Sequence, residues 1–279
     1  MLAMNQTNIT IVLPVKNEAE NLARCIDAVS DLGRVVVVDS GSSDDTQAVA
    51  QAAGAEVLEF KWNGQFPKKR NWTLRNYDFK TEWVLFLDAD EFVSPEFIQE
   101  VQTAIADTQH VGFRLHFSNY FMGEELKYGD RMCKLALFRI GAGEYEEIKE
   151  DSWSHLDMEI HEHPVLQGTI GDIQTTIEHN DYRGLKHYIG KHNEYASWEA
   201  ARFLWLLKHQ GAEWEGLTDR QKKKYRSIDK WWFAPAYFLI SYVLKKGFLD
   251  GAGGFHFALM KLFYFYQIRL KILEHRNAS

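Results

Sequence analysis

The chain has 279 residues, 46% of them hydrophobic and 25% charged, which is an ordinary composition for a globular protein. It is long enough for one large domain, or for one domain with an appendage, and no low-complexity tract marks a flexible linker. The net charge of −7 is unevenly spread: from Arg220 onward, 12 lysines and arginines stand against three acidic residues, whereas residues 1–219 carry −16. We therefore expect the C-terminal part to meet something anionic.

The two cysteines, Cys25 and Cys133, are far apart and lack a C-x-x-C pattern. This spacing argues against a redox or zinc pair, so we expect two buried thiols and a reducing compartment. No positive charge precedes Lys16, and polar residues interrupt the first apolar stretch. The N-terminus is therefore not expected to be a signal peptide.

Apolar runs and helical repeats alternate over the first hundred residues. Continuous apolar runs with no polar alternation predict strands buried on both faces of a sheet. We expect strands at 9–15, 35–38, 56–60 and 83–87, and helices at 18–30, 46–53, 66–77 and from Pro95 onward. This alternation predicts an α/β fold with parallel strands and right-handed crossovers. No G-x-G-x-x-G or G-x-x-x-x-G-K-[ST] motif is present, which disfavours the dinucleotide-binding and P-loop classes.

Three carboxylates, Asp88, Asp90 and Glu91, follow the apolar run that ends at Leu87. Open α/β sheets bind ligands at the carboxyl ends of their strands. Asp88 and Asp90 are two residues apart, so they would point the same way in an extended segment. Two hard oxygen ligands suit Mg²⁺ or Mn²⁺. The competing interpretation is a solvated acidic turn.

Several motifs in this order resemble family 2 glycosyltransferases of the GT-A fold, most closely a bacterial subgroup acting on lipopolysaccharide core and related cell-surface glycans. The resemblance covers roughly residues 9–200. The segments that carry it are 13–18 (LPVKNE), 38–46 (VDSGSSDDT), 62–64 (WNG), 69–71 (KRN), 87–91 (LDADE), His161-Glu162, His179 and 182–185 (YRGL). The sequence departs from the family pattern at Asp39-Ser40, where many relatives carry two acidic residues.

The resemblance implies a Rossmann-like GT-A sheet, mixed in strand direction and flanked by helices, with a helical C-terminal appendage. We expect residues 1–213 to form the catalytic domain and residues 214–279 to form a helical, aromatic and basic region. The implied activity is metal-dependent, inverting transfer of a sugar from a nucleotide-sugar donor, taken as a UDP-hexose. The implied acceptor is a hydroxyl of a cell-surface glycan or lipid-linked glycan such as lipopolysaccharide core.

The departing diphosphate needs a divalent ion and a cation to stabilise its charge. Asp90 is the expected ligand of Mg²⁺ or Mn²⁺, with Asp88 assisting and His179 reaching the metal from another loop. Arg70 is the candidate for the diphosphate because it can make bidentate contacts, whereas Lys68 and Lys69 are expected at the surface. The remaining residues of the expected nucleotide-sugar pocket are Pro14, Glu18, Asp39 and Ala89.

Two of these assignments have structural alternatives. Asp39 could accept a hydrogen bond from the imide N–H of the donor base, or it could cap the next helix. Glu18 could line the nucleoside pocket, or it could be a carboxylate in the first turn of a helix. The resemblance favours the pocket for Glu18, and the alternatives for Asp39 stay open.

An inverting transferase needs a general base that takes the proton of the acceptor hydroxyl. Glu162 is the expected base because it lies in the compact stretch 161–164 (HEHP) after a predicted strand. Glu91 competes with it because it adjoins the metal motif. Two other classes stay open: a metal-dependent hydrolase using Asp88, Asp90 and three histidines (His161, His163, His179), and a catalytically inactive nucleotide-sugar-binding protein.

Two aromatic stretches mark the C-terminal region. Residues 231–244 carry no charge but fall short of the roughly 20 residues of a spanning helix, and residues 255–273 mix aromatic, leucine and basic side chains. Both predict helices that lie on a membrane surface; a packed appendage or a homodimer contact is the alternative. We expect a cytoplasmic protein, peripheral on the inner face of the cytoplasmic membrane, with no nucleic-acid partner.

Overall fold

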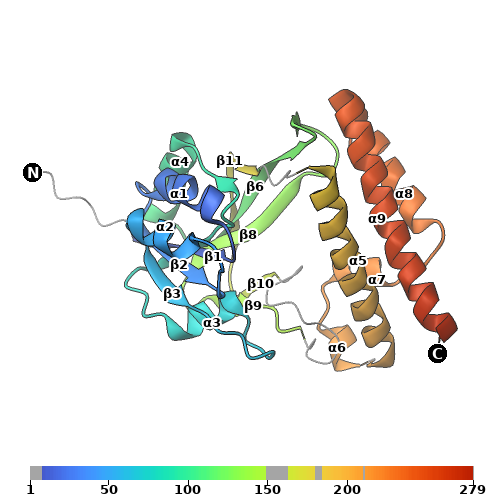
Figure 1. Ribbon diagram of the computed structural model, residues 1–279, viewed down its shortest axis with the longest axis horizontal. Helices are drawn as coiled ribbons and strands as arrows, with labels where there is room; N and C mark the ends of the chain where they lie inside the picture. The colour runs from blue at the N-terminus through green and yellow to red at the C-terminus, as the bar shows by residue number, and fades with distance from the viewer. Residues whose placement is uncertain (1–7, 149–162, 180–183, 210, 279) are drawn as a thin grey trace, which may run out of the picture. The chain divides into compact units, whose positions relative to one another are not determined.

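The computed structural model describes residues 8–148, 163–179, 184–209 and 211–278 (Figure 1). The chain divides into two compact units. The first unit contains residues 8–118, 132–148 and 163–179, and the second contains residues 119–131, 184–209 and 211–278. The expected domain boundary after residue 213 stays a prediction, because contacts alone do not show which part of the chain is catalytic.

Up to residue 106, the first unit alternates strands and helices at the places that the apolar runs and helical repeats predict, and strands alone follow. Its strands are β1 (Ile9–Val15), β2 (Arg34–Asp39), β3 (Glu56–Glu59), β4 (Trp83–Phe86), β5 (Glu91–Phe92), β6 (Gly112–Phe121), β8 (Met132–Arg139), β9 (Gly143–Tyr145), β10 (Pro164–Leu166) and β11 (Ile170–His179). Its helices are α1 (Ala19–Val29), α2 (Thr46–Ala52), α3 (Lys69–Asn76) and α4 (Pro95–Ala106). The last residues of β6 belong to the second unit.

The main sheet has the strand order β3-β2-β1-β4-β8-β6-β11-β5, and β9 and β10 form a separate pair. Strands β3, β2, β1 and β4 run parallel, with Val15 opposite Asp39 and Val12 opposite Phe86. Strand β8 pairs antiparallel with β4 and β6, and β11 pairs antiparallel with β5. The sheet is therefore mixed, as expected for the GT-A fold, and its parallel half aligns the carboxyl ends of β1, β2 and β4 at one edge.

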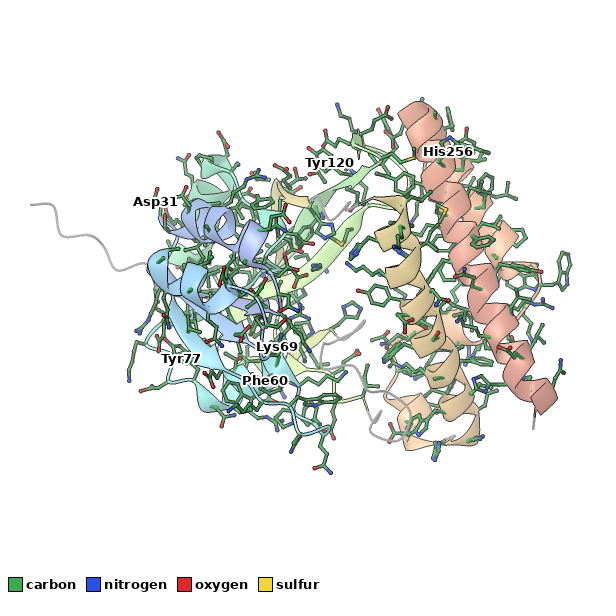
Figure 2. The ribbon with its side chains drawn as sticks, in the orientation of Figure 1. Asp31, Phe60, Lys69, Tyr77, Tyr120 and His256 are labelled. Atoms are coloured by element: carbon green, nitrogen blue, oxygen red, sulfur yellow. The ribbon has the colours of Figure 1, made fainter. Side chains whose placement is uncertain are left out.

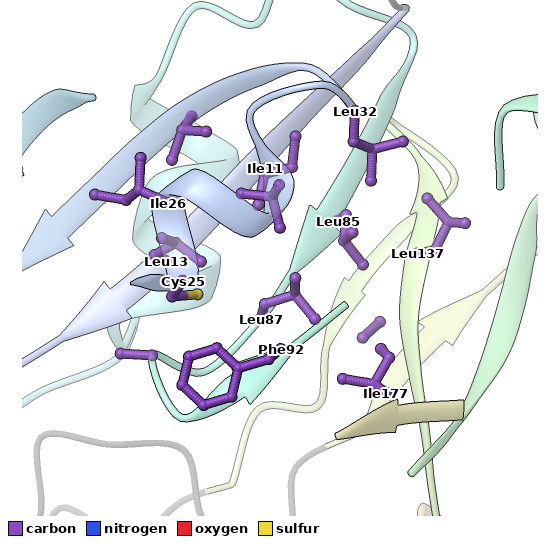
Figure 3. Packing of buried hydrophobic residues seen from close by; sticks show 14 of the residues in the cluster. Ile11, Leu13, Cys25, Ile26, Leu32, Leu85, Leu87, Phe92, Leu137 and Ile177 are labelled. Carbon is purple, nitrogen blue, oxygen red and sulfur yellow. The ribbon is translucent and has the colours of Figure 1, made fainter. Parts of the chain in front are cut away.

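The sheet of this unit is buried on both faces: one core cluster lies on the α1 face (Figure 3), and a second cluster, which includes Val12, Val36 and Phe86, lies on the other. Helix α1 turns its apolar face, with Leu22 and Ile26, onto the strand residues Leu13 and Leu85. Gly33 lies so close to the first strand that an added Cβ would stand 2.3 Å from the carbonyl oxygen of Ile9. This contact requires glycine where the chain enters β2.

The prediction of two buried thiols is right for Cys25 and wrong for Cys133. Cys25 is fully buried in the α1 face of the core, and burial raises the pKa of its thiol to about 12. Cys133 is exposed because it lies in the first half of β8, whose residues 132–135 are at most partly buried.

The second unit is mainly helical. Its elements are β7 (Glu124–Leu126), α5 (Leu185–Lys208), α6 (Ala212–Glu215), α7 (Asp219–Tyr225), α8 (Phe233–Leu239), the π-helical turn η1 (Ile240–Leu244), the 3₁₀ turn η2 (Gly247–Asp250) and α9 (Gly251–Ala278). Its core joins one face of α5 to one face of α9, through buried side chains that include Phe203, Leu206, Ile268 and Ile272. Within the described residues, no helix has both the length and the apolar character needed to cross a bilayer.

Candidate active site

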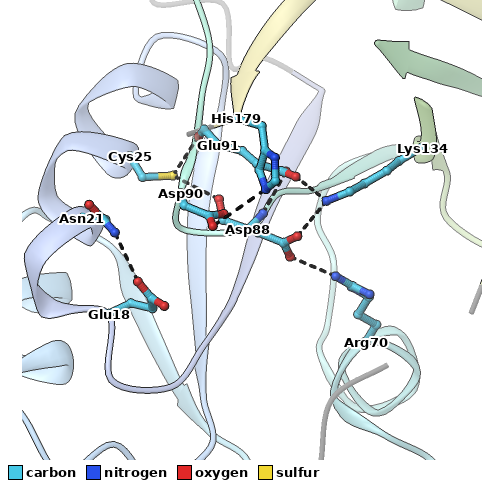
Figure 4. Close-up of polar contacts among 9 residues, drawn as sticks. All are labelled: Glu18, Asn21, Cys25, Arg70, Asp88, Asp90, Glu91, Lys134 and His179. Atoms are coloured by element: carbon cyan, nitrogen blue, oxygen red, sulfur yellow. Dashed lines mark hydrogen bonds and ion pairs between the residues drawn. The ribbon is translucent and has the colours of Figure 1, made fainter. Parts of the chain in front are cut away.

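Asp88 lies just after β4, at the edge where the parallel strands end. One of its oxygens accepts a hydrogen bond from Arg70 at 3.0 Å, and the other accepts one from Lys134 at 2.7 Å (Figure 4). Burial alone would raise the pKa of Asp88, but Lys134 and Arg70 outweigh it and hold that pKa well below its usual range. Asp88 is therefore an ionised carboxylate fixed between two cations.

The chain from Asp88 to Glu91 is a turn, closed by a hydrogen bond of 3.0 Å from the Glu91 N–H to the Asp88 carbonyl. The segment is therefore not extended, in contrast to the expectation from the sequence. The turn folds Glu91 back, so that its carboxylate accepts the Asp88 N–H at 3.0 Å and pairs with Lys134. Burial is the main cause that raises the pKa of Glu91, to about 7.

Asp90 and His179 meet across two different elements. Strand β5 pairs with β11 so that Glu91 stands opposite His179. This register brings the Nε2 atom of His179 within 3.8 Å of an Asp90 carboxylate oxygen (Figure 4). The two residues are 89 positions apart, and the sheet places them together as the metal hypothesis requires.

Asp39 ends β2 with its side chain fully buried. Its carboxylate accepts hydrogen bonds from the Gly41 and Ser42 N–H groups, from the Ser42 hydroxyl and from the Gln47 side chain at 2.7 Å. Burial would raise the pKa of Asp39, but these hydrogen bonds lower it. Asp39 organises the loop before α2, and its contact with a donor base stays a prediction.

The other expected pocket residues lie around the same sheet edge. Pro14 is half-buried in β1, opposite Val38, and Ala89 is buried in the turn after Asp88. Glu18 stands at the N-cap position of α1, yet its side chain makes no capping hydrogen bond. It accepts a hydrogen bond of 3.4 Å from the side chain of Asn21 in the first turn of α1, which is compatible with the alternative of a carboxylate at the start of a helix. Its place in the nucleoside pocket stays a prediction.

Lys68 and Lys69 are buried, which contradicts the expectation that they lie at the surface. Lys69 opens α3 and donates a hydrogen bond of 2.9 Å to the carbonyl oxygen of Val15, the last residue of β1. That carbonyl stands at the carboxyl end of the sheet, and a buried cation there satisfies it. Helix α3 therefore contributes two cations to this edge, Lys69 and Arg70.

Lys134 is the residue that the sequence analysis missed. It lies on β8 and bridges Asp88 and Glu91, which stand 46 and 43 positions earlier in the chain. Burial would lower the pKa of Lys134, but the two carboxylates raise it. In the sequence, Lys134 is noticeable only as a lysine within the strand pattern of residues 132–139, and this pattern does not indicate its partners.

Glu162, the expected general base, lies outside the described residues, and so does His161. Of the histidines in that stretch, the structure describes His163, which is exposed just before β10. The choice between Glu162 and Glu91 therefore has to come from Glu91 itself, whose carboxylate is buried and already holds two partners.

Comparison with known proteins places the chain among glycosyltransferases. An uncharacterized glycosyltransferase of Rickettsia felis is 36% identical over 99 residues, which cover 35% of this chain and 34% of that relative. An uncharacterized glycosyltransferase of Rickettsia typhi is 23% identical over 289 residues, which cover 96% of this chain and 89% of the relative. For the Rickettsia felis protein, the match spans about a third of the relative's length.

Among solved structures, glucosyl-3-phosphoglycerate synthase from Mycobacterium tuberculosis, in complex with Mn²⁺, UDP and glucosyl-3-phosphoglycerate, is 28% identical. That match has a TM-score of 0.32 and covers 41% of this chain and 44% of the synthase. The family model described as "Glycosyl transferase family 2" matches residues 10–154, more than half of the chain and the whole stretch from β1 to the acidic turn and beyond. The chain therefore belongs to glycosyl transferase family 2, an inverting family.

Proposed function

We propose that this protein transfers a hexose, with inversion, from a UDP-sugar to a hydroxyl of a lipid-linked or cell-surface glycan such as lipopolysaccharide core. The observation that supports the proposal is the meeting of Asp88, Asp90, Arg70 and His179 at one edge of the sheet. Open α/β sheets bind their ligands at such an edge. The choice of UDP, of a hexose and of the acceptor rests on the family resemblance.

The residues present fit a divalent ion. Asp90 and His179 offer an oxygen and a nitrogen 3.8 Å apart, and two ligands of one octahedral ion lie roughly 3 to 4 Å apart. Among the described residues, no set of three or more His, Cys, Asp or Glu side chains could hold a metal ion by itself. This pair therefore leaves coordination positions for phosphate oxygens and water, as Mg²⁺ and Mn²⁺ sites commonly do.

In the proposed site, Asp90 and His179 would hold Mg²⁺ or Mn²⁺, and the bound ion would neutralise charge on the diphosphate. Asp88 assists by holding Arg70 and Lys134 beside this pair. Arg70 supports that diphosphate with its guanidinium, which Asp88 already orients at 3.0 Å. The nucleoside lies against Pro14, Glu18, Asp39 and Ala89, the pocket that the resemblance implies. These groups bind and orient the donor.

Glu162 is the proposed general base that takes the proton of the acceptor hydroxyl. The contacts of Glu91 support this choice, because a base has to face the acceptor. The Glu91 carboxylate is 1% exposed and accepts hydrogen bonds from Lys134 and from the Asp88 N–H. A carboxylate so engaged holds the acidic turn in place instead.

The experiment is a donor screen that follows release of nucleoside diphosphate from UDP-, GDP- and dTDP-sugars, with Mn²⁺ or Mg²⁺ and then with a chelator. We expect turnover with a UDP-hexose, lost on chelation and restored by either ion. Metal-dependent donor binding without any transfer would instead support the inactive binding protein. Tight Zn²⁺ binding without nucleotide affinity would contradict the proposal and favour a hydrolase, an alternative that membership of family 2 disfavours.

A further inference from the structure

The outer side of α9 carries a continuous apolar stripe. Within residues 255–270, all of which the structure describes, the exposed side chains are Phe255, Leu259, Phe263, Tyr266, Leu270 and one polar residue, His256. Figure 2 shows His256 near one end of this helix. Spacings of four, four, three and four residues keep the five apolar side chains on one side of a helix. The stripe is about 22 Å long at 1.5 Å per residue.

The segment before α9 exposes a second apolar set. From Trp231, just before α8, through η1 the exposed large apolar side chains are Trp231, Trp232, Leu239, Ile240, Val243 and Leu244. Trp231 and Leu244, at the two ends, are each 74% exposed. Soluble monomers rarely leave so many large apolar side chains together on one surface without a partner.

Aromatic contacts hold α8 and η1 against the start of the α9 stripe. Phe255, the first residue of the α9 stripe, packs its ring against Phe238 at 6.1 Å and against Tyr242 at 5.6 Å. Tyr242 in turn contacts Phe248 of η2, which is 47% exposed. We call the exposed large apolar side chains of residues 231–249, together with the α9 stripe, the apolar face. The opposite side of α9 packs on α5, so these exposed side chains are not the ones that the core needs.

Charge distinguishes the possible occupants of the apolar face. Residues 230–273 contain six lysines and arginines and a single acidic residue, Asp250. The carboxylate of Asp250 is occupied by the backbone N–H groups of Lys127 and Tyr128, at 3.0 and 2.9 Å. Two copies of such a positive region would repel each other, whereas an anionic lipid surface complements it.

Several lysines of this region are already paired with carboxylates, so their charge is not the main feature of this surface. Lys222 pairs with Glu215, Lys224 with the buried Glu199, and Lys245 with Asp130 at 2.7 Å. Lys261 is half-buried, and burial lowers its pKa. Exposed lysines directly flank the segment from Trp231 to Leu244: Lys230 precedes it, and Lys245 and Lys246 follow it. The apolar side chains are therefore the main contact, and these three lysines stand at its border.

We propose that the apolar face inserts into the interfacial layer of an anionic lipid bilayer, with α9 lying in the membrane plane. Helices of this kind bury an apolar side among the acyl chains near the headgroups and keep basic residues at the headgroup level. Tryptophan is favoured at the same depth, which suits Trp231 and Trp232. The inference rests on the proposed function in one respect, since a lipid-linked acceptor gives the docking its purpose.

The test is cosedimentation of the full chain with phosphatidylglycerol-containing vesicles and with neutral phosphatidylcholine vesicles. The variants Leu244→Glu and Phe263→Glu place a charge in the apolar face at exposed positions, where the fold tolerates it. Val165→Glu makes the same kind of change at a side chain that is 61% exposed on β10 of the other unit. We expect Leu244→Glu and Phe263→Glu each to weaken binding to anionic vesicles at least tenfold, and Val165→Glu to change it less than twofold.

Three results would overturn the proposal. They are no binding of the wild type to anionic vesicles, unchanged binding by both face variants, and a wild-type homodimer that the face variants dissociate without any vesicle binding. The last result would assign the face to a second copy of this chain. UDP-sugar titration of the same proteins separates the two proposals, because lost donor binding with intact vesicle binding contradicts only the proposed function. Circular dichroism of each variant confirms that it is folded.

Discussion

Replacing Lys134 with methionine tests the charge network around the acidic turn. Methionine matches the four-atom apolar stem of lysine but lacks the ammonium group that Asp88 and Glu91 share. Asp88 keeps a second cation, Arg70 at 3.0 Å. Glu91, only 1% exposed, keeps one hydrogen bond from the Asp88 N–H and loses its ion pair.

Breaking a fully buried ion pair by removing one partner costs about 3 to 5 kcal/mol, because a charge is left buried and uncompensated. The Lys134 side chain is 31% exposed and that of Asp88 is 36% exposed, so solvent screens part of this network. We therefore expect Lys134→Met to lower the free energy of unfolding by about 2 to 3 kcal/mol at neutral pH. Lys134→Arg, which keeps the positive charge, should lower the free energy of unfolding by less than Lys134→Met does.

The loss of stability in Lys134→Met should depend on pH in a defined direction. The pKa of Glu91 in the folded protein, about 7, lies above its ordinary value of 4.5, mainly because of burial. The folded state then binds the proton more tightly than the unfolded state, so its stability falls as pH rises from 4.5 through 7. Without Lys134 the pKa of Glu91 rises further, and the stability deficit of Lys134→Met should grow between about pH 6 and pH 8.5.

Urea denaturation of the wild type, Lys134→Met, Glu91→Gln and the double variant, at both pH values, measures these free energies. The double variant removes the stranded carboxylate, so it should be more stable than Lys134→Met alone. A Lys134→Met protein within about 0.5 kcal/mol of the wild type, or with a deficit that shrinks as pH rises, would refute the reasoning.

Three further predictions concern the chemistry of the site. Asp90→Asn should abolish metal-dependent binding of UDP-sugar in calorimetric titrations, and normal turnover by this variant would remove the metal assignment. Glu162→Gln cannot accept a proton and should lower kcat by about 10²-fold with donor affinity kept, whereas a comparable loss in Glu91→Gln with unchanged stability would move the base to Glu91. Asp39→Asn should lower the free energy of unfolding by about 1 to 3 kcal/mol, because the NH₂ group of the new amide would face the backbone N–H donors of the next loop. Those hydrogen bonds lower the pKa of Asp39, so the stability difference between the wild type and this variant should disappear as pH falls below about 3.8.

The sequence by itself determined strands β1 to β4, helices α1 to α4 and the position of the acidic residues after β4. The runs at 9–15, 35–38 and 83–87 are continuous and apolar, a pattern that depends only on neighbouring residues, and all three are buried strands. The ordered motifs also indicated family 2 correctly. Parallel strands end at one edge, so the sequence predicted that edge as the place of the site.

Only the tertiary structure decided which side chains meet there. Lys134 reaches Asp88 because β8 pairs antiparallel with β4, and His179 reaches Asp90 because β11 pairs with β5. Lys69 is buried because the end of β1 offers it a carbonyl oxygen. Such partners are joined by strand register and by packing across tens of residues, and local periodicity carries no information about either. For the same reason the sequence located the apolar and basic C-terminal segments, whereas the packing of α5 against α9 decided which of their side chains stay exposed.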